Sequence, residues 1–138
     1  MSNTSTQNPL ALVVDDSGMV RRMVCAMLHH LGYATCEAAD GIALLEQAAR
    51  QPVDIVITDL NMPQMDGLTA CRQLRLGGSR LPMIILTTYT GQDDDALAAG
   101  VNVVMHKPVT TATLKQAIDK ACASAAGRSG RPAFTSAV

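Results

Sequence analysis

The chain has 138 residues, a formal net charge of −1 and only three aromatic residues, Tyr33, Tyr89 and Phe134. This length fits one domain whose core needs neither disulfides nor structural metal ions. The charge gives no general attraction to nucleic acids or anionic membranes, and so few aromatic side chains argue against base stacking.

Residues 1–8 are polar and have neither the basic region nor the apolar segment of a signal peptide, so we expect a disordered N-terminus. No apolar run approaches the roughly 20 residues of a membrane span. The four cysteines lack metal-ligand spacing, and reduced thiols suit a cytoplasmic protein. We therefore predict a cytoplasmic protein that makes no contact with a membrane.

Short apolar segments alternate with amphipathic segments between residues 9 and 123, which we predict to form the domain. Predicted strands cover Leu10–Val14, Tyr33–Glu37, Val53–Thr58, Leu81–Leu86 and Val101–Met105. Predicted helices cover Met19–Leu31, Gly41–Arg50, Gly67–Leu76, Gln92–Ala99 and a last segment from Thr110 or Thr111 to Cys122. Residues 124–138 are rich in Ala, Ser, Gly, Arg and Pro, which predicts a disordered tail.

Five strand–helix repeats indicate an α/β fold with a doubly wound, five-stranded parallel sheet and helices on both faces. Segment 33–37 is the least apolar strand and belongs at the sheet edge. Residues that follow parallel strands meet at one edge of the sheet. There the chain delivers Asp15, Asp16, Asp59, Thr87 and Lys107.

Three carboxylates that converge repel one another unless a cation lies between them. Mg²⁺ is the cation that suits such oxygen ligands, and it usually also binds water and phosphate oxygens. A carboxylate can act as a nucleophile toward phosphorus, and an ammonium group can pair with a phosphoryl group. The set therefore predicts phosphoryl chemistry at this edge of the sheet.

These motifs resemble the receiver domain of two-component response regulators, both chemotaxis-type single-domain receivers and receivers of phosphorelays or hybrid kinases. The matching residues are Asp15-Asp16, Asp59 to Pro63, Asp66-Gly67, Thr87 and Lys107-Pro108. The resemblance implies a flavodoxin-like fold with strand order 2-1-3-4-5. It also implies a phosphorylation-controlled signalling switch rather than an enzyme, with a sensor histidine kinase or histidine phosphotransfer protein as phosphodonor.

The resemblance also implies residue roles. Asp59 would accept the phosphoryl group, and Mg²⁺ would be bound by Asp16, Asp59 and the Asn61 carbonyl directly and by Asp15 through water. Thr87 and Lys107 would respond to the phosphoryl group. The backbone amides of Asn61 and Thr88 would hold its oxygens, and the Lys107–Pro108 bond would be cis.

Two regions of the sequence concern how the protein would pass its signal to a partner protein. Val104 and Val109 stand where many such receivers carry aromatic residues, and the segment from Thr87 to Gly100 is short, so the fourth helix should be short. Met19, Met23 and Ala26 form a second apolar stripe on the first helix. This stripe, together with Val104, is either a partner face or packs under neighbouring loops.

Two other functions remain open at this point. One is a phosphate sink or phosphorelay intermediate without conformational output, which Val104 makes credible. The other is a Mg²⁺-dependent phosphatase with an Asp nucleophile, disfavoured because Asn61 replaces the general acid expected two residues after Asp59. The switch would act through an unidentified protein target, without nucleic acid, as a monomer or weak homodimer.

Overall fold

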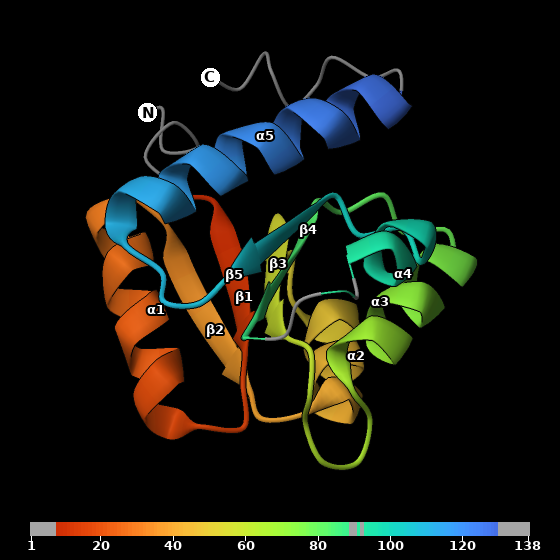
Figure 1. The fold of residues 1–138 in the computed structure, drawn as a ribbon, viewed down its shortest axis with the longest axis horizontal. Coiled ribbons are helices and arrows are strands. Elements are labelled where there is room, and N and C mark those ends of the chain that lie inside the picture. Colours follow the sequence, from red (N-terminus) through yellow and green to blue (C-terminus); the bar gives the residue numbers. More distant parts are fainter. Residues whose placement is uncertain (1–7, 89–90, 92, 130–138) are drawn as a thin grey trace.

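A computed structural model describes residues 8–88, 91 and 93–129 of the chain. Five strands alternate with five helices, as predicted (Figure 1). The strands are β1 (Leu10–Val14), β2 (Ala34–Ala38), β3 (Ile55–Asp59), β4 (Met83–Thr87) and β5 (Val103–His106). The helices are α1 (Gly18–His30), α2 (Gly41–Arg50), α3 (Gly67–Leu76), α4 (Asp93–Ala98) and α5 (Thr111–Ser129).

The strands form one parallel sheet in the order β2-β1-β3-β4-β5, which confirms the flavodoxin-like topology. Two apolar layers cover it. Side chains of α1 and α5 pack on one face of the sheet, and side chains of α2, α3 and α4 pack on the other. The three central strands β1, β3 and β4 are apolar and buried almost throughout, because both of their faces are covered.

Short polar residues begin the helices that follow the site loops. Ser17, Asp40 and Asp66 each accept a hydrogen bond from a first-turn backbone amide. Asp is a favoured N-cap residue, so Asp40 and Asp66 suit these positions. The cap of α1 is Ser17, whose amide donates to Asp15 Oδ1. Asp15 Oδ2 and the Asp16 carboxylate are available for another role.

The edge strand and the fourth helix follow the sequence expectation. β2 lies at the sheet edge and has exposed residues at Ala34 and Glu37. α4 has only six residues, from Asp93 to Ala98. Gln92, the predicted first residue of this helix, lies outside the described residues.

The fifth helix is longer than its composition predicted. α5 continues to Ser129, whereas we expected a disordered tail from residue 124. Ala is the strongest helix former, and Ala121 and Ala125 are both buried one turn apart. The Ser124 hydroxyl also accepts a hydrogen bond from the Asn102 side chain. Residues 1–7 and 130–138, which we predicted to be disordered, lie outside the described residues.

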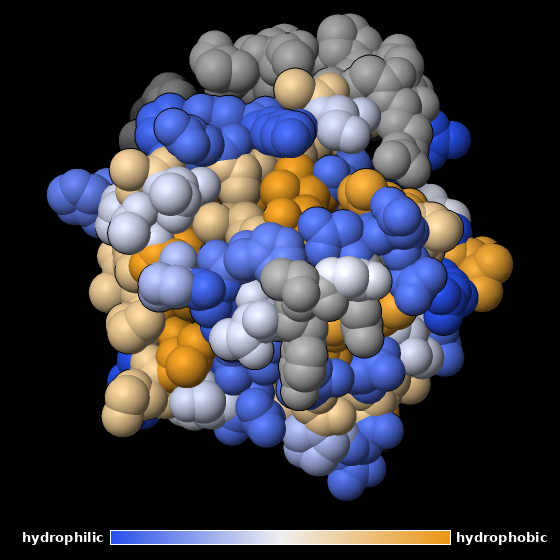
Figure 2. All heavy atoms as spheres, in the orientation of Figure 1, coloured by the Kyte–Doolittle hydropathy of each residue, from blue (hydrophilic) through white to orange (hydrophobic). Residues whose placement is uncertain are grey.

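The surface carries separate apolar patches among hydrophilic residues (Figure 2). In the part of the chain that the structure describes, the large exposed apolar side chains are Met19, Met23, Ile42, Leu76 and Leu97. Met19 is 70% exposed and Met23 is 48% exposed, so the stripe on α1 faces solvent rather than packing under loops. Among the described residues, no helix is long and apolar enough to cross a membrane.

Candidate functional site

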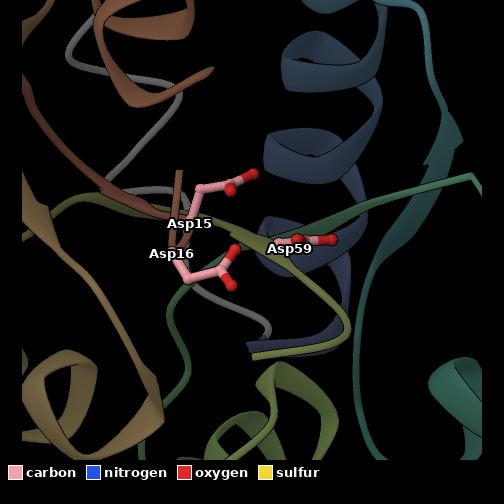
Figure 3. A group of neighbouring side chains, drawn as sticks. All are labelled: Asp15, Asp16 and Asp59. Atoms are coloured by element: carbon pink, nitrogen blue, oxygen red, sulfur yellow. The ribbon is translucent and has the colours of Figure 1, made fainter. Parts of the chain in front are cut away.

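Three carboxylates meet where β1 and β3 end. Each of Asp15, Asp16 and Asp59 offers an oxygen that lies within 4.8 Å of the other two (Figure 3). Asp15 is buried, Asp59 is partly buried and Asp16 is exposed. The register of the central strands explains the meeting, because Val14 pairs with Thr58 and the next residues of both strands are therefore neighbours.

The turn that carries Asp15 and Asp16 is held through its backbone. The Asp15 amide donates to the Ala38 carbonyl at 3.2 Å, and the Asp15 carboxylate accepts the Ser17 amide at 2.9 Å. The Asp15 carbonyl accepts a hydrogen bond from Arg21 Nη1. These bonds leave the second carboxylate oxygen of Asp15 directed to the site.

The loop after Asp59 depends on a glycine. The Gly67 amide donates to the Leu60 carbonyl at 2.9 Å, which brings the start of α3 against the end of β3. A Cβ atom at Gly67 would collide with the Asp59 carbonyl oxygen and lie 2.9 Å from Thr58 Oγ1. Only glycine therefore permits this close approach beside the carboxylate.

Lys107 brings an ammonium group from the end of β5. Its Nζ lies 3.3 Å from Asp15 Oδ2 and 3.5 Å from Asp59 Oδ1. Its backbone amide donates to the Thr87 carbonyl at 2.9 Å, and the Lys107–Pro108 bond is cis, the geometry that the resemblance implies. Within the described part of the chain, Lys107 is the one cationic side chain paired with these carboxylates.

The charge imbalance appears in the pKa of Asp59. Burial raises the pKa of this carboxyl above its usual value, and the negative charge of Asp15 raises it further. The Lys107 ammonium and the Leu60 amide, which donates to Asp59 Oδ1 at 2.8 Å, offset part of this rise. When all three carboxylates are ionised, the single Lys107 ammonium does not balance their negative charge.

The remaining predicted residues lie around this cluster at the same edge. Thr87 ends β4 and is buried, and Asn61 and Thr88 are exposed on the loops after β3 and β4. Val104, in β5, is partly buried and packs against the apolar layer of α2, α3 and α4. His106 is exposed and lies 3.4 Å from the Asp93 carboxylate at the start of α4, a pairing that the sequence did not indicate.

The donor set fits a hard divalent cation. Carboxylate oxygens from two neighbouring strand ends converge on one point, and the buried member, Asp15, is the one that Lys107 neutralises best. Mg²⁺ prefers such oxygen ligands and retains several waters, which the exposure of Asp16 would allow. Zn²⁺ would favour nitrogen or sulfur ligands, and this cluster contains neither.

Comparison with known proteins decides the family. The sequence profile of the response regulator receiver domain matches residues 11–119. The chain belongs to this family. It is a two-component signalling receiver with an acidic site of the kind that binds Mg²⁺. Receiver domains are signalling modules rather than catalytic enzymes, which removes the phosphatase alternative.

Similar receivers occur both alone and within kinases. The chemotaxis protein CheY-3 of Vibrio cholerae is 37% identical over 119 residues, which cover 83% of this chain and 92% of that protein. The sensor histidine kinase RcsC of Salmonella typhimurium is 34% identical over 116 residues, which cover 83% of this chain but 12% of the kinase.

Solved structures agree with this receiver fold. The chemotaxis response regulator CheY4 of Vibrio cholerae superposes with a TM-score of 0.76 at 31% identity, covering 83% of this chain and 99% of that one. The response regulator TrrA of Thermotoga maritima, in complex with Mg²⁺ and BeF, has a TM-score of 0.76 at 27% identity over 82% of this chain and 98% of that one.

Proposed function

We propose that this receiver is a phosphorylation-controlled switch in which Asp59 accepts a phosphoryl group from a phosphohistidine. The observation that supports this role most directly is the position of Asp59. Its carboxylate ends the central strand β3, lies within reach of Asp15 and Asp16, and has the Lys107 ammonium 3.5 Å away. The phosphodonor is a sensor histidine kinase or a histidine phosphotransfer protein.

In the transfer, an Asp59 carboxylate oxygen forms a bond to phosphorus as the phosphorus–nitrogen bond to the donor imidazole breaks. Lys107 stabilises the added negative charge as a point cation. Asp16, Asp59 and the Asn61 carbonyl would hold Mg²⁺, with Asp15 acting through water. The bound ion supplies the positive charge that the three carboxylates lack.

The phosphoryl group adds a charge of roughly −1.5 to −2 at this edge of the sheet. Thr87 and the Thr88 amide respond to it, and the start of α4 moves with them. Output then passes to another protein, because the added charge shifts the population toward a conformation that this partner prefers.

Acetyl phosphate and Mg²⁺ test the acceptor. We expect intact-protein mass spectrometry to show one added phosphoryl group on the wild type and on Asp94→Asn, an exposed aspartate of α4, and none on Asp59→Asn. Equal labelling of wild type and Asp59→Asn would refute the assignment.

Val104 favours a second candidate, a phosphate sink or phosphorelay intermediate. A partly buried valine at this position offers no aromatic ring that can change rotamer with phosphorylation. This function predicts normal phosphotransfer with unchanged binding of other proteins. Pull-downs with and without beryllofluoride discriminate the two, because the switch requires a partner whose capture changes.

The exposed stripe of Met19, Met23 and Ala26 is our proposed docking face for the phosphodonor. It lies on α1, which begins directly after the Asp15–Asp16 turn. The double substitution Met19→Ser and Met23→Ser should slow phosphotransfer from the kinase while labelling by acetyl phosphate stays normal. Leu97→Ser, at an apolar position on α4 about as exposed as Met23, should leave both rates unchanged.

A further inference from the structure

Arg21 connects the acidic site to the edge strand. From the first turn of α1, its Nη1 donates to the Asp15 carbonyl at 2.6 Å and its Nε donates to Glu37 Oε1 at 2.8 Å. The Arg21 side chain is 22% exposed, which is well below the 43% of its partner Glu37. The guanidinium is therefore held between Asp15, which directly follows β1, and Glu37, the penultimate residue of β2.

The same edge strand also holds the other side of Asp15. The Asp15 amide donates to the Ala38 carbonyl, the residue that follows Glu37 in β2. The peptide groups on both sides of Asp15 are thus tied to β2, one directly and one through Arg21. β2 itself contributes none of the three carboxylates.

We propose that Arg21, held by Glu37, is a positioning residue for the Mg²⁺ site. By binding the Asp15 carbonyl, Arg21 sets the orientation of the Asp15–Asp16 peptide and hence the direction of both carboxylates. This inference rests on the proposed function of the acidic site as a Mg²⁺ site. On this inference, the edge strand β2 keeps the acidic site in the geometry that binds Mg²⁺.

Arg21 can affect Mg²⁺ binding in two opposite directions, one through its charge and one through its hydrogen bond to the Asp15 carbonyl. A cation near the site repels Mg²⁺, so its removal alone would strengthen Mg²⁺ binding. Loss of the hydrogen bond to the Asp15 carbonyl lets the turn reorient, which weakens binding. Partners that orient metal ligands typically contribute 10–100-fold to affinity, which exceeds the electrostatic gain from removing one partly exposed cation.

Isothermal titration calorimetry with MgCl₂ at constant ionic strength is the test. We expect Arg21→Ala to raise the Kd for Mg²⁺ by about tenfold. Arg22→Ala removes the same charge from the next residue, which is exposed, and should leave the Kd unchanged or slightly lower. An Arg21→Ala protein that binds Mg²⁺ as tightly as the wild type, or more tightly, overturns the inference.

Two further variants separate positioning from a general loss of stability. Arg21→Lys restores the cation but not the two-sided guanidinium contact, so we expect its Kd to lie between those of wild type and Arg21→Ala. Glu37→Ala removes only the exposed partner and should raise the Kd about threefold, as a partial effect of the same kind. Should Arg21→Ala fail to fold, an unchanged Kd in Glu37→Ala overturns the inference.

Mg²⁺ binding by the wild type and by Asp59→Asn distinguishes a failure of the proposed function from a failure of the Arg21 inference. If the wild type itself shows no Mg²⁺ binding, or if Asp59→Asn binds Mg²⁺ as well as the wild type, then the acidic cluster is not the proposed site and both proposals fall. If the wild type binds and Asp59→Asn does not, the proposed site stands, and the Arg21 variants decide the positioning role alone.

Discussion

The two ends of the sheet hold polar clusters of opposite character. At the carboxyl end, three carboxylates face one ammonium group, and the pKa of Asp59 is raised. At the amino end, Arg75 donates to the carbonyls of Gly100 and Ser79 and to Asn102 Oδ1. Asn102 Oδ1 also accepts the Met83 amide.

The cluster at the amino end stabilises the fold, whereas the cluster at the carboxyl end suits a ligand. The cluster around Arg75 pairs donors with acceptors and ties α3, β4 and β5 together, so it contributes to stability without further components. The cluster around Asp59 is short of positive charge, so it gains stability only when a cation arrives. Four perturbations test this contrast.

The largest effect should come from a glycine substitution at the carboxyl end of the sheet, with a glycine at the amino end as its control. Gly67→Ala forces a Cβ against the Asp59 carbonyl oxygen, and we expect a loss of about 3 kcal/mol of unfolding free energy, measured by urea denaturation. Gly77→Ala, at the C-cap of α3 near the amino end of the sheet, has φ −80° and room for a Cβ, so it should change stability by less than about 1 kcal/mol.

Addition of Mg²⁺ should stabilise the protein only through the carboxyl-end cluster. At 100 times its Kd, a ligand that binds only the folded state adds about 2.7 kcal/mol. Differential scanning calorimetry should show this gain in the wild type and in Arg75→Ala, and lose it in Asp16→Asn. A Mg²⁺-induced rise in Tm that survives in Asp16→Asn would contradict the assignment of the site.

Removal of the amino-end cation should destabilise the fold whether or not Mg²⁺ is present. Arg75→Ala removes a donor from the Gly100 and Ser79 carbonyl oxygens and leaves Asn102 Oδ1 with the Met83 amide, at a loss of about 2 kcal/mol. Arg72→Ala, an exposed position on the same helix, is the control and should be nearly neutral. Equal unfolding free energies for the two variants would show that the Arg75 cluster does not stabilise the fold.

The smallest effect should be a gain in stability, from the substitution Asp59→Asn in the absence of Mg²⁺. Because the folded state raises the pKa of Asp59, it binds this proton more tightly than the unfolded chain does, and stability falls as pH rises through that pKa. Asp59→Asn removes the ionisation, so without Mg²⁺ its Tm should exceed that of the wild type by a few degrees at pH 7. The difference should vanish in acid, below the ordinary pKa of aspartate.

Thermal denaturation between pH 3.5 and pH 7.5 measures that difference. A wild type that is more stable than Asp59→Asn at pH 7 without divalent cations would show that Lys107 already balances the three carboxylates.

Much of the site could be predicted because strand direction alone brings residues together. The alternation of apolar and amphipathic segments implied parallel strands, so Asp15, Asp16, Asp59 and Lys107 had to meet at one edge. The helix caps Asp40 and Asp66 are local features, because Asp is favoured at a helix start whatever the tertiary contacts are. The short fourth helix was likewise visible from the length of its segment.

Other features depended on contacts between distant parts of the chain. The end of α5 at Ser129 was predicted too early, because burial of Ala125 and the bond from Asn102 to Ser124 are tertiary interactions. The exposure of Met19 and Met23 was also undecided, since an apolar stripe on a helix can face either solvent or a loop.

By itself, then, the sequence determined the order of elements, the parallel sheet and the identity of the residues at its carboxyl edge, since these follow from periodicity and chain direction. Only the tertiary structure decided how the site is supported. The hydrogen bonds of Arg21 to Asp15 and Glu37 join helix α1 to two different strands, and the close approach of Gly67 to Asp59 depends on how α3 packs. Such contacts depend on backbone distances in three dimensions, which residue type and spacing do not specify.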